Sequence, residues 1–167
     1  MLCFHFFGRE VIMGRRWRFW PLTGFLTAAV LGTLAHFAYR WSGGALLAGV
    51  FCAVNESVWE HMKLLFFPVF LFTAAQFCVG ERDGLLAARA VSVTAGLALI
   101  PTLYYTYTGI WGDHVLWADA AIFYLSAAVT FWLDDLLHRQ RRLWKMEYQV
   151  AGLVWLWVLA FLFVWWT

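Results

Sequence analysis

The sequence has few charged residues for its length. Only 13% of its 167 residues are Asp, Glu, Lys or Arg, against roughly 25% in a soluble domain. So few charges cannot cover a surface that faces water, and 63% of the residues are hydrophobic. A formal net charge of +2 offers no basic surface for nucleic acid. The composition therefore excludes an ordinary soluble domain and predicts that lipid surrounds much of the chain.

Cysteines and the common nucleotide-binding and catalytic motifs are also scarce. The three cysteines, Cys3, Cys52 and Cys78, form no C-x-x-C pair, and we interpret them as small apolar residues. The sequence lacks G-x-x-x-x-G-K-[ST], G-x-G-x-x-G, G-x-S-x-G and H-E-x-x-H. It also has no internal repeat, which argues against a carrier built from inverted repeats. Transport driven by nucleotide binding to this chain is therefore disfavoured.

Long apolar runs are what the sequence does contain. A helix needs about 20 mostly apolar residues to cross a bilayer. Five runs meet this requirement, and each is bounded by polar or charged residues. We therefore predict an all-α integral membrane protein that forms a single transmembrane domain over residues 1–167. Its predicted spans are residues 19–37, 58–79, 85–107, 115–133 and 148–166.

The basic residues predict how these spans are oriented. If the amino terminus is cytoplasmic, every Lys and Arg except Arg40 and Lys63 falls on the cytoplasmic side. The opposite orientation would invert this bias, which the positive-inside rule disfavours. We therefore predict a protein of the cytoplasmic membrane with its amino terminus inside and its carboxy terminus outside. The predicted cytoplasmic basic residues are Arg9, Arg15, Arg16, Arg18, Arg82, Arg89, Arg139, Arg141, Arg142 and Lys145.

Two further segments need an interpretation. Residues 1–18 are predicted to form a cytoplasmic tail, and either Met1 or Met13 could be the true start. The run 15–38 also fits a signal peptide, but its apolar part is long, so we favour a retained first span. Residues 43–54 are apolar, yet as a helix they would extend only about 18 Å, too short to cross. We expect them to form a short interfacial or re-entrant helix on the outer side, with a break near Asn55.

The densest polar patch is Asn55-Glu56-Ser57-Val58-Trp59-Glu60-His61-Met62-Lys63. On a helix, Glu56 and Glu60 share a face, and His61 follows directly. Two carboxylates beside an imidazole suit a divalent metal such as zinc, or acid–base catalysis. A structural interpretation stays open, because Ser57-x-x-Glu60 is a capping box and Lys63 could extend to the membrane interface. Capping leaves Glu56 and His61 unexplained.

His36 continues a stripe of small residues along the first span. Gly24, Ala28, Gly32 and His36 recur at every fourth position. Small residues at this spacing allow another helix to approach closely, so we expect His36 to point into the bundle. There it is either a hydrogen-bonded structural residue or a metal ligand.

Asp119 belongs to a polar stripe on the fourth span. Asp119, Ser126, Thr130 and Asp134 lie at helical spacing and predict a face turned inward. A carboxylate one turn inside the membrane is costly, so Asp119 is a candidate ligand or base. The alternative is a salt bridge from Asp119 to Arg40 or Lys63. Asp134-Asp135-x-x-His138 has a metal-like spacing, but a local charge network with Arg139, Arg141 and Arg142 is the simpler interpretation.

The run Val54 to Pro68 resembles a family of small bacterial membrane proteins. That family is catalogued as a domain of unknown function with the pattern V-N-E-S-V-W-E-H-x-K-L-x-F-x-P. The resemblance is specific over these residues, and elsewhere it depends on length and span number. It implies a multi-span protein without assigning an activity. The distinctive residues that it implies are Asn55, Glu56, Trp59, Glu60, His61 and Lys63.

Three functions remain open from the sequence. The first is a membrane-embedded, metal-dependent enzyme for a lipid-like substrate, with Glu60, His61, His36 and Asp119 as ligands or base. Glu56 would then be an acid–base partner. The second is a small transporter or ligand-binding subunit, in which a homo-oligomer or partner membrane subunit supplies symmetry. The third is a structural accessory subunit, in which the patch only caps a helix.

Overall fold

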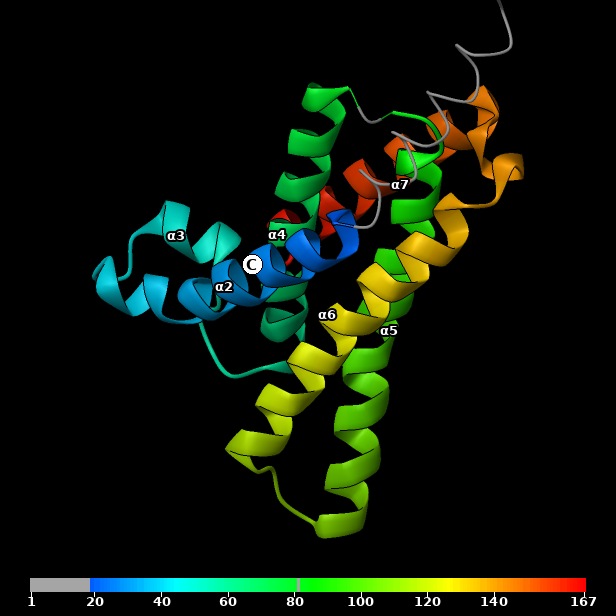
Figure 1. Cartoon of the computed structure of the whole chain (residues 1–167). Helices are drawn as coiled ribbons and strands as arrows, with labels where there is room; N and C mark the ends of the chain where they lie inside the picture. The colour runs from blue at the N-terminus through cyan, green and yellow to red at the C-terminus, as the bar shows by residue number, and fades with distance from the viewer. Residues whose placement is uncertain (1–18, 81) are drawn as a thin grey trace, which may run out of the picture.

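The computed structural model describes residues 19–80 and 82–167, and this part of the chain is helical without strands (Figure 1). Five of its helices are long and apolar enough to cross a membrane. The predicted tail, residues 1–18, lies outside the described residues. The long helices are α2 (Trp20–Trp41), α4 (Val58–Val79), α5 (Leu85–Trp111), α6 (Leu116–His138) and α7 (Met146–Trp165). The short ones are α3 (Leu46–Phe51) and the 3-10 helix η1 (Arg141–Trp144).

The five predicted apolar helices are confirmed, and α4 has the predicted bounds. Three helices end later than predicted, and the first of them, α2, continues to Trp41. α5 continues to Trp111 and ends at Gly112, whose φ of +81° suits a glycine cap. α6 continues to His138. The polar residues Asp134 and His138, which follow the predicted span, are buried inside this helix and do not end it.

The short helix α3 covers less than the predicted 43–54. Gly43 and Gly44 form a turn with φ of +68° and +83°, so α3 begins only at Leu46. After Phe51 the backbone is extended at Cys52. The chain then runs without helix to Ser57, which gives the predicted break near Asn55.

The small residues of α2 allow it to lie against α4 and α6. Gly24, Ala28 and Gly32 are buried, as their spacing predicts. A Cβ on Gly32 would lie 2.8 Å from the carbonyl oxygen of Leu64 and 2.4 Å from the Phe123 ring. Neither distance leaves room for a methyl group. The stripe therefore fixes where α2 crosses its neighbours, and it brings His36 toward the start of α4.

The core is aromatic and aliphatic, and apolar residues also cover the outside. Phe66, Phe131 and Phe163 are buried where α4, α6 and α7 pack. Large apolar side chains such as Trp157 and Phe161 on α7 are exposed. The outward-facing surface is thus as apolar as a bilayer interior requires.

Candidate metal centre

The centre begins with the turn that starts α4. The Ser57 side chain accepts a hydrogen bond from the backbone N–H of Glu60 at 3.3 Å, so Ser57 is the N-cap that the sequence predicts. The second half of the capping box is absent, because Asn55 Oδ1 accepts from the Ser57 N–H at 2.9 Å. Asn55 therefore replaces Glu60 in the cap. The Glu60 carboxylate is left for a different role.

Glu60 and Lys63 form a buried ion pair. Glu60 Oε2 lies 2.8 Å from Lys63 Nζ, and it also accepts from the Val54 N–H at 2.9 Å. Lys63 is 0% exposed, so the predicted extension to the interface is wrong. Its ammonium group also donates to the Gly49 carbonyl at 3.0 Å and the Thr167 hydroxyl at 3.1 Å. This pair, which we call the latch, ties α3 and the chain before Glu56 to the first turn of α4.

Three other side chains converge at the same end of α4. The ligand atoms of His36, Glu56 and His61 all lie within 4.8 Å of one another. Glu56 bridges the two imidazoles, with Oε1 at 3.7 Å from His36 Nε2 and Oε2 at 3.7 Å from His61 Nε2. The residues come from α2, the chain before α4 and α4 itself. Sequence neighbours alone could not have assembled them.

A hydrogen bond from the His61 ring determines that Nε2 is the nitrogen with a free lone pair toward this centre. Nδ1 lies 2.9 Å from the Ser57 carbonyl oxygen, which can only accept, so Nδ1 carries the proton. A neutral ring then keeps its lone pair on Nε2, the atom that faces Glu56. Metal-binding histidines are commonly oriented by such a bond. The first turn of α4 thus both carries and orients this ligand.

The donor set matches one that occurs in catalytic zinc sites. Two imidazoles and one carboxylate leave a fourth position for water or substrate. Ligands about 2.0–2.1 Å from a tetrahedral metal lie roughly 3.4 Å apart, close to the 3.7 Å separations observed. The centre is open, since 60% of the Glu56 side chain is exposed. These residues therefore fit a divalent cation once the cluster, whose ligand atoms lie within 4.8 Å of one another, contracts around it.

The other predicted site residues lie elsewhere. Glu60 is in the latch beside Lys63. Asp119 accepts from the Tyr107 hydroxyl and lies 3.4 Å from His114 Nδ1. The predicted salt bridge from Asp119 to Arg40 or Lys63 is absent from the described residues. Trp59 packs on Phe163 with ring centroids 4.7 Å apart, a structural position.

A second polar centre, which the sequence prediction missed, lies inside the bundle. Arg89 donates to both carboxylate oxygens of Asp134, at 3.1 and 3.0 Å, and to Gln76 Oε1 at 2.7 Å. The Arg89 side chain is 1% exposed. Asp134 therefore pairs across helices and not with its local arginines, whereas Asp135 does pair with Arg139. The polar stripe on α6 that includes Asp134 was the signal for this pair in the sequence. Arg89 on α5 had been predicted to lie on the cytoplasmic side, so the pair was missed.

Cys52 lies beside α3 and is not suited to be a ligand. Burial raises the pKa of its thiol, and the nearby Lys63 charge offsets this only in part. A thiol must lose its proton to bind metal or to act as a nucleophile. Cys52 is therefore a small apolar residue in practice, as predicted.

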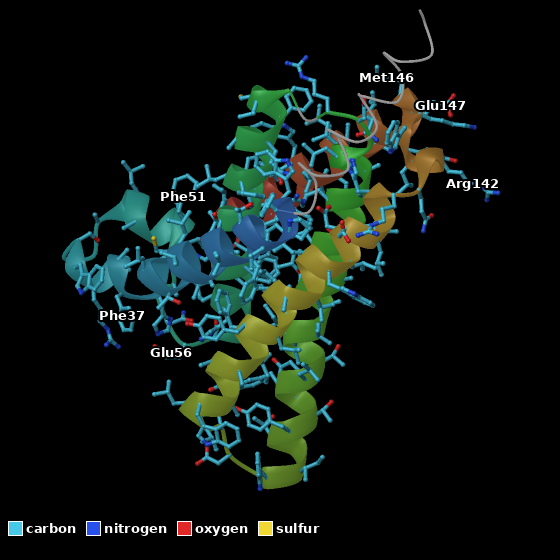
Figure 2. All side chains as sticks on the ribbon, in the orientation of Figure 1. Phe37, Phe51, Glu56, Arg142, Met146 and Glu147 are labelled. Carbon is cyan, nitrogen blue, oxygen red and sulfur yellow. The ribbon has the colours of Figure 1, made fainter. Side chains whose placement is uncertain are left out.

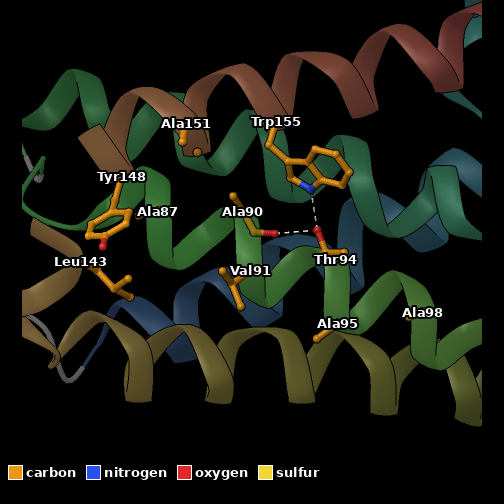
Figure 3. Close-up of a pocket in the computed structure, with 11 residues that line it drawn as sticks. Ala87, Ala90, Val91, Thr94, Ala95, Ala98, Leu143, Tyr148, Ala151 and Trp155 are labelled. Carbon is orange, nitrogen blue, oxygen red and sulfur yellow. Dashed lines mark hydrogen bonds between the residues drawn. The ribbon is translucent and has the colours of Figure 1, made fainter. Parts of the chain in front are cut away.

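The main grooves of the structure are apolar and separate from the metal centre. One groove of about 730 Å³ lies between α2, α3, α4 and α7. It is lined by Phe51, which Figure 2 shows on the opposite side of α2 from Glu56. A second, of about 590 Å³, lies between α5 and α7 (Figure 3). Its Thr94 hydroxyl accepts from Trp155 Nε1 and donates to the Ala90 carbonyl, so these polar groups are satisfied. Apart from Cys52 in the first groove and Tyr148 in the second, the lining residues of these two grooves carry no titratable group.

Fold and site together define an all-helical protein of membrane-length helices with a histidine–carboxylate centre at one end. The model of the family of unknown function DUF6512 matches residues 11–167, and the chain belongs to that family. Neither the curated proteins nor the solved structures contain a match. The sequence resemblance to a family of unknown function is thereby confirmed at the level of the family.

Proposed function

We propose that the protein is a membrane-embedded enzyme that uses a divalent metal, zinc in the first instance, to act on a lipid-like substrate. The observation that carries the proposal is the convergence of His36, Glu56 and His61 with ligand atoms within 4.8 Å. Ionisable groups in a membrane bundle are costly and commonly mark function. A structural cap needs only Ser57 and Asn55, and it leaves this cluster unexplained.

We further propose that this centre faces away from the cytoplasm of a bacterial cell. Apart from Arg40 and Lys63, the described basic residues gather at the opposite end of the helices, around the α4–α5 and α6–α7 connections. That asymmetry supports a cytoplasmic amino terminus. Cysteines placed at Ser42 and Asp83 test this in intact cells. Only the first should react with a membrane-impermeant maleimide, and the reverse pattern would overturn the orientation.

Each residue of the centre has a distinct proposed role. His36, Glu56 and His61 hold the cation, and Ser57 fixes the His61 ring. Glu60 and Lys63 position the chain before Glu56. A divalent cation held by these residues would polarise a substrate oxygen and lower the pKa of a bound water. The apolar outer surface of α2, including the exposed Phe37 and Trp41, supports a substrate that arrives from the lipid phase.

Elemental analysis of the purified protein tests the proposal. Wild type should carry close to one zinc per chain after zinc is added and excess is removed. His36→Ala, Glu56→Gln and His61→Ala should each lose it. His114→Ala is the matched control, because this histidine lies in the α5–α6 connection and should leave the zinc content unchanged. A well-folded wild type that takes up neither zinc, manganese nor iron would overturn the proposal.

A further inference from the structure

The last turn of α2 carries an arginine four residues after the proposed ligand His36. Arg40 follows His36 by four residues on the same helix, so the two share a face about 6 Å apart along the axis. Arg40 is exposed, and no carboxylate among the described residues lies within ion-pair distance of it. Arg89 and Arg139, in contrast, are each paired with an aspartate.

The charges within the centre itself do not balance once a metal is bound. A divalent cation brings two positive charges and Glu56 offers one negative charge, so the centre keeps a net positive charge. Arg40 adds another. Glu60 cannot compensate, because its carboxylate is already paired with Lys63. The Asp119 carboxylate, at the same end of the bundle, accepts from the Tyr107 hydroxyl and lies beside His114. The combined site therefore calls for an anion at the open metal position.

Phosphate is the anion that fits this pair of groups. Its several oxygens allow one to bind the cation while others accept from a guanidinium, whose fork of N–H donors matches phosphate. Divalent cations commonly hold phosphate oxygens in this way. A single carboxylate has fewer oxygens to divide between the cation and Arg40.

The surface next to the site indicates that the phosphate belongs to a lipid. Phe37 lies edge-on to the His36 ring with centroids 5.0 Å apart, and it stacks on Trp41 at 5.8 Å. Trp41 is 70% exposed. Exposed aromatic residues at a helix end are typical of the headgroup level of a membrane. An acyl chain attached to the bound phosphate could lie along this apolar surface.

We infer that the His36–Glu56–His61 centre, together with Arg40, binds the phosphate group of a membrane phospholipid. The inference rests on the proposed function, because it needs the cation. Arg40 is in this account a binding residue for the substrate and has no part in holding the metal. The two contributions can therefore be separated by mutation.

Binding of short-chain lipids to the zinc-loaded protein in detergent tests the inference. The probes are dioctanoyl phosphatidic acid, dioctanoylglycerol, which lacks the phosphate, and inorganic phosphate. Binding is followed by native mass spectrometry, and zinc is measured on the same samples. Arg40→Gln should keep its zinc and bind the phosphatidic acid about tenfold more weakly, the loss expected for a charged hydrogen bond. Arg82→Gln, at the α4–α5 connection, is the matched control and should bind like wild type.

The outcomes separate the two proposals. Two results with zinc-loaded protein would overturn the phosphate inference and leave the metal centre standing. One is that Arg40→Gln binds phosphatidic acid as tightly as the wild type does. The other is that the wild type binds dioctanoylglycerol as tightly as phosphatidic acid. If inorganic phosphate binds as tightly as the lipid, the lipid part is overturned. If the wild type holds no zinc, the proposed function fails and this inference fails with it. Loss of both zinc and phosphatidic acid binding in His61→Ala supports the two together.

Discussion

Glu60 Oε2 lies 2.8 Å from Lys63 Nζ, one turn further along α4, and both side chains are buried. The two residues sit inside the most distinctive motif of the sequence, yet they bind each other and the surrounding backbone. Their neighbours Glu56 and His61 face the other way, toward His36. One short motif thus serves two purposes, because successive helical residues point in different directions.

Removing Lys63 should destabilise the protein and loosen the metal centre. In Lys63→Met the Glu60 carboxylate stays buried without its partner, a change that costs about 3–5 kcal/mol. We expect a lower melting temperature in detergent and weaker zinc binding, which excess zinc restores. Lys145→Met, at an exposed position, is the control. An unchanged melting temperature in Lys63→Met would contradict the structural role of the latch.

The buried pair of Arg89 and Asp134 should behave as one unit. Arg89→Met or Asp134→Leu alone leaves an uncompensated charge inside the bundle, at a cost of about 3–5 kcal/mol. The double variant removes both charges and should recover most of that loss. Unfolding of the four proteins, wild type included, in a mixed-micelle denaturant series measures the coupling. Additive losses would show that the two side chains do not interact as described.

Close packing at Gly32 should make even a methyl group unfavourable there. A Cβ at this position would lie within 2.8 Å of the Leu64 carbonyl oxygen, which belongs to the backbone of α4 and cannot move aside. Gly32→Ala should therefore cost about 1–3 kcal/mol. Gly109→Ala, where a Cβ meets open space, is the matched control and should stabilise α5 by about 0.5–1 kcal/mol. Equal effects at the two glycines would argue against this helix crossing.

The reactivity of Cys52 should depend on pH in a direction set by its surroundings. Because its pKa is raised, little of the thiol is ionised at pH 8, and alkylation should be slow there and accelerate above pH 9. Lys63→Met removes the charge that lowers this pKa, so the pH profile should move further upward. The rates are measured by mass spectrometry in a Cys3→Ser, Cys78→Ser background. Fast alkylation at pH 7 would contradict the raised pKa of this thiol.

The existence of the five helices follows from local features of the sequence. Each apolar run is long enough to form a membrane-length helix by itself, so no distant contact is needed to predict it. The Ser57 cap and the Gly24–Gly32 stripe are also local patterns. Helix ends were harder to predict, since a segment rich in polar residues, such as Asp134 to Arg139, resembles the end of an apolar helix until the buried positions of Asp134 and His138 inside α6 are known.

Only the tertiary structure decided which ionisable side chains meet. In the sequence, Glu60, His61, His36 and Asp119 were candidate ligands or bases, and Glu56 was a candidate acid–base partner. The rotation of α4 placed Glu60 against Lys63, and the crossing of α2 at Gly32 brought His36 to Glu56 and His61. The sequence by itself determined the class of protein, because hydrophobicity over 20 residues is a local property. The composition of the site depended on helix rotation and loop path, which arise from contacts between segments far apart in the chain.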